Sequence, residues 1–164
     1  MLQEIKHNNQ LLAIIISNKY SEPGIQFFTP DDFSQQLAFM KHPAGKIIQP
    51  HVHNSVQREV HFTKEVLFIR KGKIRIDFYT NQQDYIDSHI LETGDVILLS
   101  EGGHGFEILE ETEMIEVKQG PYAGEKDKSR FGPVAEDKVK FATNQEDRQL
   151  DIRLQEKTMR RHYK

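Results

Sequence analysis

Cysteine and tryptophan are both absent from this chain of 164 residues. Without cysteine the protein has no disulfide, no thiolate zinc site and no cysteine nucleophile, so any metal must be held by nitrogen and oxygen ligands. A basic excess is also lacking, since 22 Lys and Arg residues stand against 25 Asp and Glu residues and the net charge is -3. This balance gives no reason to expect nucleic acid or an anionic membrane surface as a partner.

Long hydrophobic runs are lacking as well. The most apolar early stretch, "LLAIII" at residues 11–16, is shorter than a signal-peptide core, follows polar "KHNNQ" and precedes no small-residue cleavage site. It is also far too short to span a bilayer. We therefore expect no membrane association and a cytoplasmic location. With 37% apolar and 29% charged residues, the chain is typical of a globular protein with one main domain.

Sustained helical periodicity is rare between residues 11 and 118, where short hydrophobic runs alternate with turn residues. This pattern predicts an all-β fold. The turns "RKGK", "TNQQD", "ETGD" and "SEGG" are rich in residues that tolerate tight turns. The expected strands cover residues 11–17, 46–53, 64–70, 73–79, 85–91, 95–99, 104–109 and 114–118. So many short strands suggest a closed or double-sheet architecture, which hides strand edges.

A short N-terminal helix is expected at "TPDDFSQQLAF", residues 29–39. Thr29 can cap it, Pro30 suits the first helical position, and the two following aspartates favour the positive end of the helix dipole. After "QGPYAGEKDKSRFGP" the composition changes, and the last residues are poor in apolar side chains. We therefore expect a single domain over residues 1–143 and a polar C-terminal tail, helical or disordered, over residues 144–164.

Three of the eight histidines fall within "PHVHNSVQREVH", residues 50–61. His51 and His53 are separated by one residue, and alternation along a strand sends both imidazoles to the same face, close enough to share one ion. Two surface histidines on an edge strand would give the same pattern. The pair by itself therefore leaves a metal site and a solvated strand both open.

Two further metal-capable side chains stand at the starts of predicted strands. Glu65 opens "EVLFIRKGK" and shares a face with Leu67 and Ile69, where a carboxylate is costly to bury unless it is paired or coordinated. It can also lie at a strand end and face solvent. His104 directly follows a Gly-Gly turn and shares a strand face with Phe106, although by itself it is typical of a surface turn.

Together these residues resemble the two-part signature of the cupin superfamily. The glycines, histidines and glutamate that carry the resemblance are Gly45, His51, His53, Glu65 and Gly72 in the first motif and Gly94 and His104 in the second. The resemblance covers residues 45–108 by motif and 11–118 by strand pattern. It implies a small jelly-roll barrel, also described as a double-stranded β-helix, in which the three histidines and the glutamate hold one divalent metal ion.

Three imidazoles and one carboxylate suit iron, manganese, nickel, zinc or copper better than calcium or magnesium, which favour shells of oxygen ligands. Eleven residues, "NSVQREVHFTK", separate His53 from Glu65, which is longer than the spacing usual in cupins and marks an insertion at the mouth of the site. Glu59 or His61 within it could replace Glu65 as a ligand. Glu65 is preferred because it has the correct distance to Gly72 and leads into an apolar strand.

The same insertion offers two substrate-binding candidates, Arg58 and His61, which could bind an anionic group or move a proton. A polar loop that covers a strand edge is the alternative. The resemblance implies a metal-binding protein that acts on a small polar metabolite, with a sugar or sugar phosphate as the first expectation and an isomerase-like or polysaccharide-pathway role. An iron-dependent dioxygenase and a non-catalytic ligand-binding or sensory domain are alternatives. A homodimer is also compatible with the resemblance, with residues 11–17 as a candidate contact.

Overall fold

The computed structural model describes residues 1–142 and shows an all-β protein. Its strands are β1 (Leu2–His7), β2 (Gln10–Ile16), β3 (Gly24–Phe27), β4 (Ala38–Lys41), β5 (Glu65–Lys71), β6 (Lys73–Tyr79), β7 (Tyr85–Glu92), β8 (Val96–Leu99), β9 (Gly103–Ile108) and β10 (Glu113–Lys118), followed by the 3₁₀ helices η1 (Gly124–Asp127) and η2 (Glu136–Lys138). No helix in this described part is long and apolar enough to cross a membrane. The polar tail expected at residues 144–164 lies outside the described residues.

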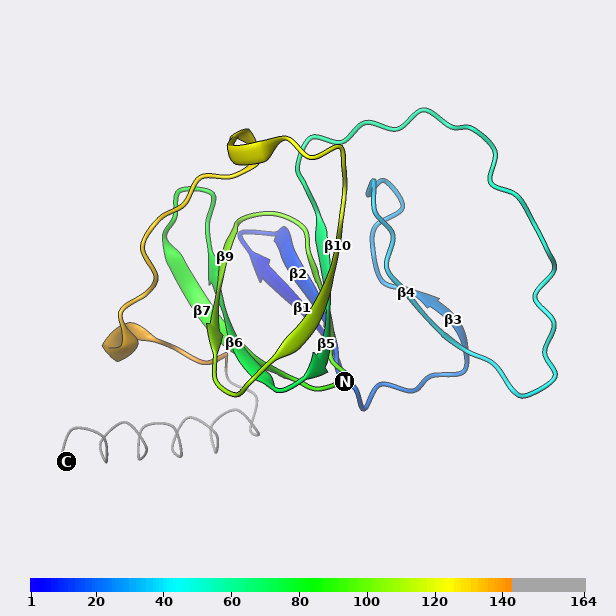
Figure 1. The fold of residues 1–164 in the computed structure, drawn as a ribbon, viewed down its shortest axis with the longest axis horizontal. Coiled ribbons are helices and arrows are strands. Elements are labelled where there is room, and N and C mark those ends of the chain that lie inside the picture. Colours follow the sequence, from blue (N-terminus) through cyan, green and yellow to red (C-terminus); the bar gives the residue numbers. More distant parts are fainter. Residues whose placement is uncertain (143–164) are drawn as a thin grey trace.

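Two antiparallel sheets pack against each other, and the β3–β4 hairpin lies beside them (Figure 1). One sheet has five strands in the order β1-β2-β8-β5-β10, and the other has three in the order β7-β6-β9. The chain crosses between these sheets after β5, β7, β8 and β9. The crossing from β5 to β6 takes one residue, Gly72, whose φ of 88° is a left-handed conformation that glycine adopts without steric cost.

The main core lies between the two large sheets. Inward-facing residues of both sheets form it: Ile5, Leu12, Ala13, Ile15, Leu67, Ile69, Ile97 and Leu99 from the five-stranded sheet, and Ile74, Ile76, Phe78 and Leu91 from the three-stranded sheet. A second cluster covers the outer face of the five-stranded sheet, where Leu37 packs with Ile14, Ile16, Val66 and Leu98. The five-stranded sheet is therefore apolar on both faces, which explains its continuous hydrophobic runs.

The candidate dimer contact at residues 11–17 lies in this buried sheet. It corresponds to β2, which pairs with β1 on one edge and β8 on the other. Its side chains from Leu12 to Ile16 are all buried. This run therefore offers no surface to a second copy.

The helix expected at residues 29–39 is wrong, because residues 29–37 form turns and loop and β4 begins at Ala38. The Thr29 hydroxyl donates to the Gln36 side-chain oxygen at 2.7 Å and accepts the Leu37 backbone N–H at 3.2 Å. The Gln36 amide in turn donates to the Pro30 carbonyl at 2.9 Å. These side chains bond the backbone groups that a helix would need, and the turn brings Leu37 onto the sheet.

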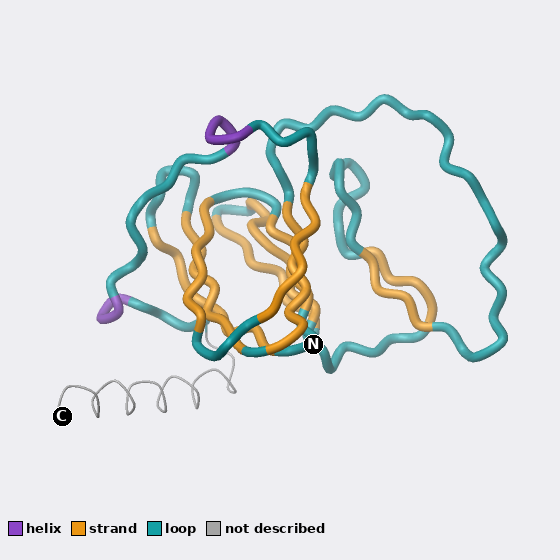
Figure 2. The backbone as a smooth tube through the Cα atoms, in the orientation of Figure 1, coloured by secondary structure: helices purple, strands orange, loops and turns teal. Residues whose placement is uncertain are grey.

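The strand expected at residues 46–53 is also wrong, because the whole stretch of residues 42–64 is a loop without helix or strand (Figure 2). The loop leaves β4, extends away from the two large sheets and returns to β5 (Figure 1). Within residues 1–142, β9 pairs only with β6 and β10 only with β5. Both strands keep a free edge, so the two sheets do not close into a barrel.

Candidate functional site

Glu65 and His104 meet across the space between the two large sheets. Glu65 is the first residue of β5 and His104 is the second residue of β9, and the Glu65 Oε2 atom lies 3.2 Å from the His104 Nε2 atom. Both side chains point inward, because Glu65 shares a strand face with buried Leu67 and His104 pairs across the sheet with buried Phe78. The side chains are 15% and 29% exposed. This contact joins two of the four side chains that the sequence singled out as metal ligands.

The surroundings favour the ionised form of the Glu65 carboxyl group. Hydrogen bonding to His104 lowers the pKa of Glu65 below its usual 4.5, although burial acts in the opposite direction. The positive charges of His104, Lys118 and Lys128 lower this pKa further. The Lys118 Nζ atom lies 3.8 Å from Glu65 Oε1 and 2.9 Å from Glu116 Oε1, and the bond to Glu116 raises the pKa of Lys118. Glu65, His104 and Lys118 therefore place a carboxylate, an imidazole and an ammonium group side by side.

A cavity of about 740 Å³ opens beside this pair. It extends around the free edge of β9, because His104 and Phe106 line it from the inner face of that strand and Gly105 and Glu107 line it from the outer face. The segment at residues 127–134 forms another wall. A cavity of this size is in the range of small-molecule sites.

The other two predicted metal ligands, His51 and His53, lie in the exposed loop at residues 42–64. Their rings stay near each other, with centroids 5.2 Å apart, and the His51 Nδ1 atom lies 3.0 Å from the Gln49 carbonyl oxygen. Within the described residues, no group of three or more His, Cys, Asp and Glu side chains could hold a metal ion. Glu65 and His104 have the right donor types, but a complete metal site does not fit this arrangement, because two protein ligands fall short of the three or four usual for these ions.

The substrate-binding candidates Arg58 and His61 also lie on the exposed loop, and neither lines the cavity. Arg58 donates to the Val56 carbonyl at 3.5 Å. His61 Nε2 lies 3.5 Å from the carboxylate of Glu59, the alternative ligand, and both of these side chains are more than three-quarters exposed, at 79% and 78%. From the end of this loop, Phe62 and Thr63 reach the cavity wall instead.

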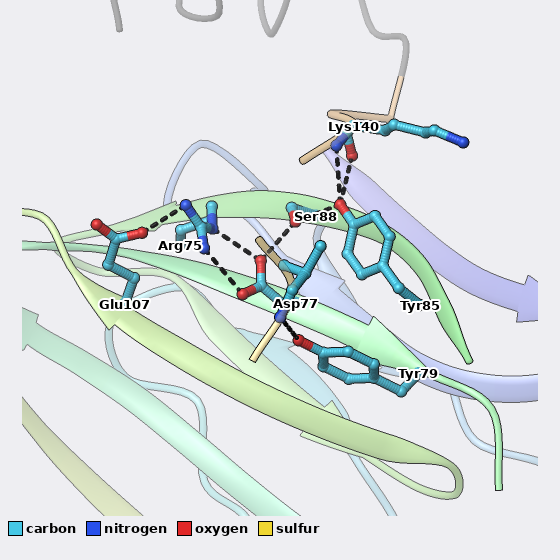
Figure 3. Close-up of polar contacts among 8 residues, drawn as sticks. Arg75, Asp77, Tyr79, Tyr85, Ser88, Glu107 and Lys140 are labelled. Carbon is cyan, nitrogen blue, oxygen red and sulfur yellow. Dashed lines mark hydrogen bonds and ion pairs between the residues drawn. The ribbon is translucent and has the colours of Figure 1, made fainter. Parts of the chain in front are cut away.

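A buried polar network on the outer face of the three-stranded sheet was not foreseen from the sequence (Figure 3). Arg75 and Asp77 alternate with core residues along β6, and the Arg75 guanidinium donates to both carboxylate oxygens of Asp77, at 2.7 and 3.0 Å. Their side chains are only 11% and 4% exposed. The Ser88 hydroxyl also donates to Asp77, and Arg75 forms a second ion pair with Glu107. Burial acts to lower the pKa of Arg75, but the bonds and charges of Asp77 and Glu107 outweigh it and hold that pKa above its usual value.

This network also holds the segment that follows η2. The Tyr85 hydroxyl lies 2.7 Å from the Ser88 hydroxyl and donates to the Lys140 carbonyl at 3.1 Å, while the Lys140 N–H donates to the Tyr85 oxygen at 2.9 Å (Figure 3). The Ser88 N–H donates to the same carbonyl at 2.8 Å. Burial raises the pKa of Tyr85, so its hydroxyl stays protonated and can donate. The only local signal for this network is the alternation of Arg and Asp in "KIRIDFY", which is typical of a polar strand face and carries no sign that a distant segment covers it.

The arrangement around Glu65 and His104 can bind hydroxyl or phosphate groups and can move a proton. Carboxylate oxygens accept hydrogen bonds, a lysine ammonium attracts anions, and an imidazole can give or take a proton near neutral pH. Glu65, His104 and Lys128 line a cavity that is large enough for a small metabolite. No family model, curated protein or solved structure matches the chain.

Proposed function

We propose that this chain is a cupin-type protein that binds a small polar metabolite, such as a sugar or sugar phosphate, beside Glu65 and His104. The observation that carries the proposal is the 3.2 Å contact between these side chains at the wall of a cavity of about 740 Å³. Two antiparallel sheets linked by repeated crossings are also the architecture expected of a jelly roll, and they support the resemblance.

The chemistry of the pair suits a reaction that transfers a proton. Glu65 stays ionised because its pKa is lowered, so it can hold the His104 imidazole in one orientation through the Nε2 atom. An aldose–ketose conversion takes a proton from one carbon and returns it to the neighbouring carbon, and a positioned carboxylate or neutral imidazole can take and return that proton. Lys128, which lines the cavity, can attract the phosphate groups of the substrate.

The proposal includes a divalent transition metal only if the loop at residues 42–64 contributes ligands to it. Glu65 and His104 supply two donors, and His51 and His53 would supply the others if the loop moved toward β9. When bound, such an ion would polarise a substrate oxygen. The residues of the two sheets would then orient the substrate and exclude water from it.

Elemental analysis of protein purified without added metal, followed by titration with manganese, iron and zinc, tests the metal part. His104→Ala and His51→Ala are expected to lose most of the bound metal, whereas His7→Ala, on β1 at the opposite edge of the five-stranded sheet from β10, is the matched control and should keep it. A full equivalent of metal in His51→Ala would remove the loop from the ligand set.

Binding of a metabolite without a metal is the second candidate, and it is favoured by the lack of a third donor near Glu65 and His104 within residues 1–142. A thermal-shift panel of sugars and sugar phosphates, run in the presence of a chelator, tests it. Stabilisation of the wild-type chain that is lost in Glu65→Gln would support metal-free binding at this pair. An unchanged melting temperature throughout the panel would contradict it.

A further inference from the structure

The segment at residues 119–142 runs from the end of β10 past β9 to β7, where Phe141 forms a bridge with Ser88 (Figure 1). On its way, residues 127–134 line the cavity. No residue between 119 and 142 is buried. The segment therefore has the few buried contacts that are typical of a part of a protein that opens locally.

Two tyrosines hold this segment at separate places. The Tyr79 hydroxyl accepts the Val134 N–H at 2.9 Å, and the Tyr79 ring packs edge-on against Phe131 with centroids 4.9 Å apart. Tyr85 bonds the backbone of Lys140, which lies beyond η2. The part of the segment that lines the cavity can therefore leave Tyr79 while the chain beyond η2 stays attached to Tyr85.

The Phe131 ring fits a notch beside Tyr79. A Cβ atom on Gly103 would lie 3.0 Å from the Phe131 ring and 3.2 Å from the Tyr79 Cβ atom, so only a glycine leaves enough room for this ring. Tyr79 is 3% exposed and belongs to the fixed part of the protein. The notch between β6 and β9 therefore favours one closed position of the segment.

The closed segment brings two charged side chains to the pair of Glu65 and His104. The Asp127 carboxylate accepts the Thr63 hydroxyl at 2.8 Å, and both residues line the cavity. The next residue, Lys128, also lines the cavity, and its positive charge lowers the pKa of Glu65. The segment therefore changes the charge at the pair when it closes.

Lys128 has an ammonium group that can bind a ligand. The other two cations that line the cavity, Arg75 and Arg130, are each paired with a carboxylate. No such ion pair involves Lys128 in the part of the chain that the structure describes, and Lys128 is exposed. A lysine without a carboxylate partner can bind an anionic group such as a phosphate.

We propose that residues 124–134 form a lid over the cavity, that Tyr79 is the latch that holds it closed, and that Lys128 binds an anionic group of the substrate. The inference rests on the proposed function, because it assigns the anion-binding residue of that same site. Opening of the lid admits the substrate, and closing excludes water from Glu65 and His104. Because the anion binds Lys128 in the closed position, it shifts the lid toward that position.

A single tryptophan can report the position of the lid, because the chain contains none. Phe131→Trp places it against Tyr79, where a closed lid should shield it from quenching by acrylamide. Adding Tyr79→Phe removes the acceptor of the Val134 N–H. Quenching should then increase, because the loss of one net hydrogen bond of about 1 kcal/mol raises the open fraction roughly fivefold. Tyr85→Phe is the matched control and should leave the quenching unchanged.

Hydrogen exchange of the chain without tryptophan is a second measurement that does not depend on the fit of the larger ring. Peptides from residues 124–134 should exchange faster in Tyr79→Phe, and peptides from residues 139–142 should exchange faster in Tyr85→Phe. The lid is overturned if Tyr79→Phe leaves residues 124–134 unchanged. It is also overturned if both variants loosen both regions equally, because the segment would then open as one strap.

Inorganic phosphate is the probe for Lys128 and is compared with chloride at constant ionic strength. In the Phe131→Trp chain, phosphate should reduce the quenching by acrylamide. Lys128→Gln should abolish this effect, whereas Lys126→Gln, in η1 and outside the cavity wall, should keep it. Equal protection in the two lysine variants, or no protection in the Phe131→Trp chain, would overturn the role of Lys128.

Failure of the proposed function would give a different result. If no sugar or sugar phosphate stabilises the chain, but the latch variants and phosphate behave as expected, the lid is supported and the substrate class is wrong. If sugar phosphates bind and Glu65→Gln abolishes the binding, but Tyr79→Phe changes neither quenching nor exchange, the proposed function is supported and the lid is overturned.

Discussion

The contact between Glu65 and His104 is expected to contribute a measurable coupling energy to stability. The two side chains lie 3.2 Å apart and are mostly buried, so the contact belongs with hydrogen bonds to charged groups, which contribute about 1.5–3 kcal/mol. Because both side chains keep some exposure and Lys118 also interacts with Glu65, we expect the lower part of this range, about 1.5–2 kcal/mol. A double-mutant cycle with Glu65→Gln, His104→Ala and the double variant measures it by urea unfolding.

The cycle has a control within the same chain. Glu125 and Arg130 also form an ion pair, but their side chains are 74% and 68% exposed, so their coupling should stay between about 0 and 0.5 kcal/mol. A coupling between Glu65 and His104 no larger than that of the control pair would refute the inference that the two sheets hold this contact in place.

The pH dependence of the same coupling gives an independent check. The pKa of Glu65 is lowered below 4.5 in the folded chain, so its contribution to stability is fully present above that value. The contribution is lost as the pH falls through the lower pKa of the folded state, because the unfolded chain then binds the proton more readily. As the pH falls, the Glu65→Gln variant should therefore lose less stability than the wild-type chain. Identical acid unfolding of the two proteins would refute the assigned direction of the shift.

Two further substitutions test the fold around the site. Asp77→Ala should lower the free energy of unfolding by about 3–5 kcal/mol, because it removes the carboxylate that pairs with buried Arg75. Asp77→Asn should lower it by less. Urea unfolding measures both variants, and an equal loss of stability in the two would contradict a role for the charge. Gly72→Ala should lower the free energy of unfolding by more than the roughly 1–2 kcal/mol of a left-handed backbone, because its Cβ would lie 2.2 Å from the Glu111 carbonyl oxygen. Gly45 also has a left-handed φ, of +82°, but no atom lies within 4 Å of the added Cβ. Gly45→Ala should therefore show the backbone cost alone. Equal melting temperatures for the two glycine variants would contradict the steric clash.

Most strands could be predicted because their signals are local. Alternating or continuous apolar runs between turn residues placed β6 at residues 73–79, as observed, and β2 at 11–17 against the observed Gln10–Ile16. Strand β1 was missed because Ile5 is its only buried residue. A signal for it exists in "HNNQ", since Asn8 and Asn9 adopt φ of 49° and 65° in the two-residue turn that joins β1 to β2.

The approach of Glu65 to His104 was expected from the resemblance and not from local patterns alone. Each residue stands near the start of a strand and shares its face with core residues. By itself, however, each local pattern also fitted a side chain that faces solvent. The position of His51 and His53 did not follow from local patterns. Residues 46–53 were predicted as a strand, but they lie in a loop, because a strand also needs a neighbouring strand to pair with and a local pattern does not specify that neighbour.

The outer wall of the cavity shows the same limit of local patterns. Arg75 and Asp77 occupy alternate positions of β6, which for an isolated sheet would face solvent. They are buried because a later part of the chain returns to this face: the Val134 N–H donates to the Tyr79 hydroxyl at 2.9 Å, and the Phe131 ring packs edge-on against Tyr79 with centroids 4.9 Å apart. The segment at residues 131–134 therefore lies more than fifty positions from the strand that it covers, since the bond between positions 79 and 134 spans 55 residues. A substitution in this returning segment should alter the cavity without touching Glu65 or His104.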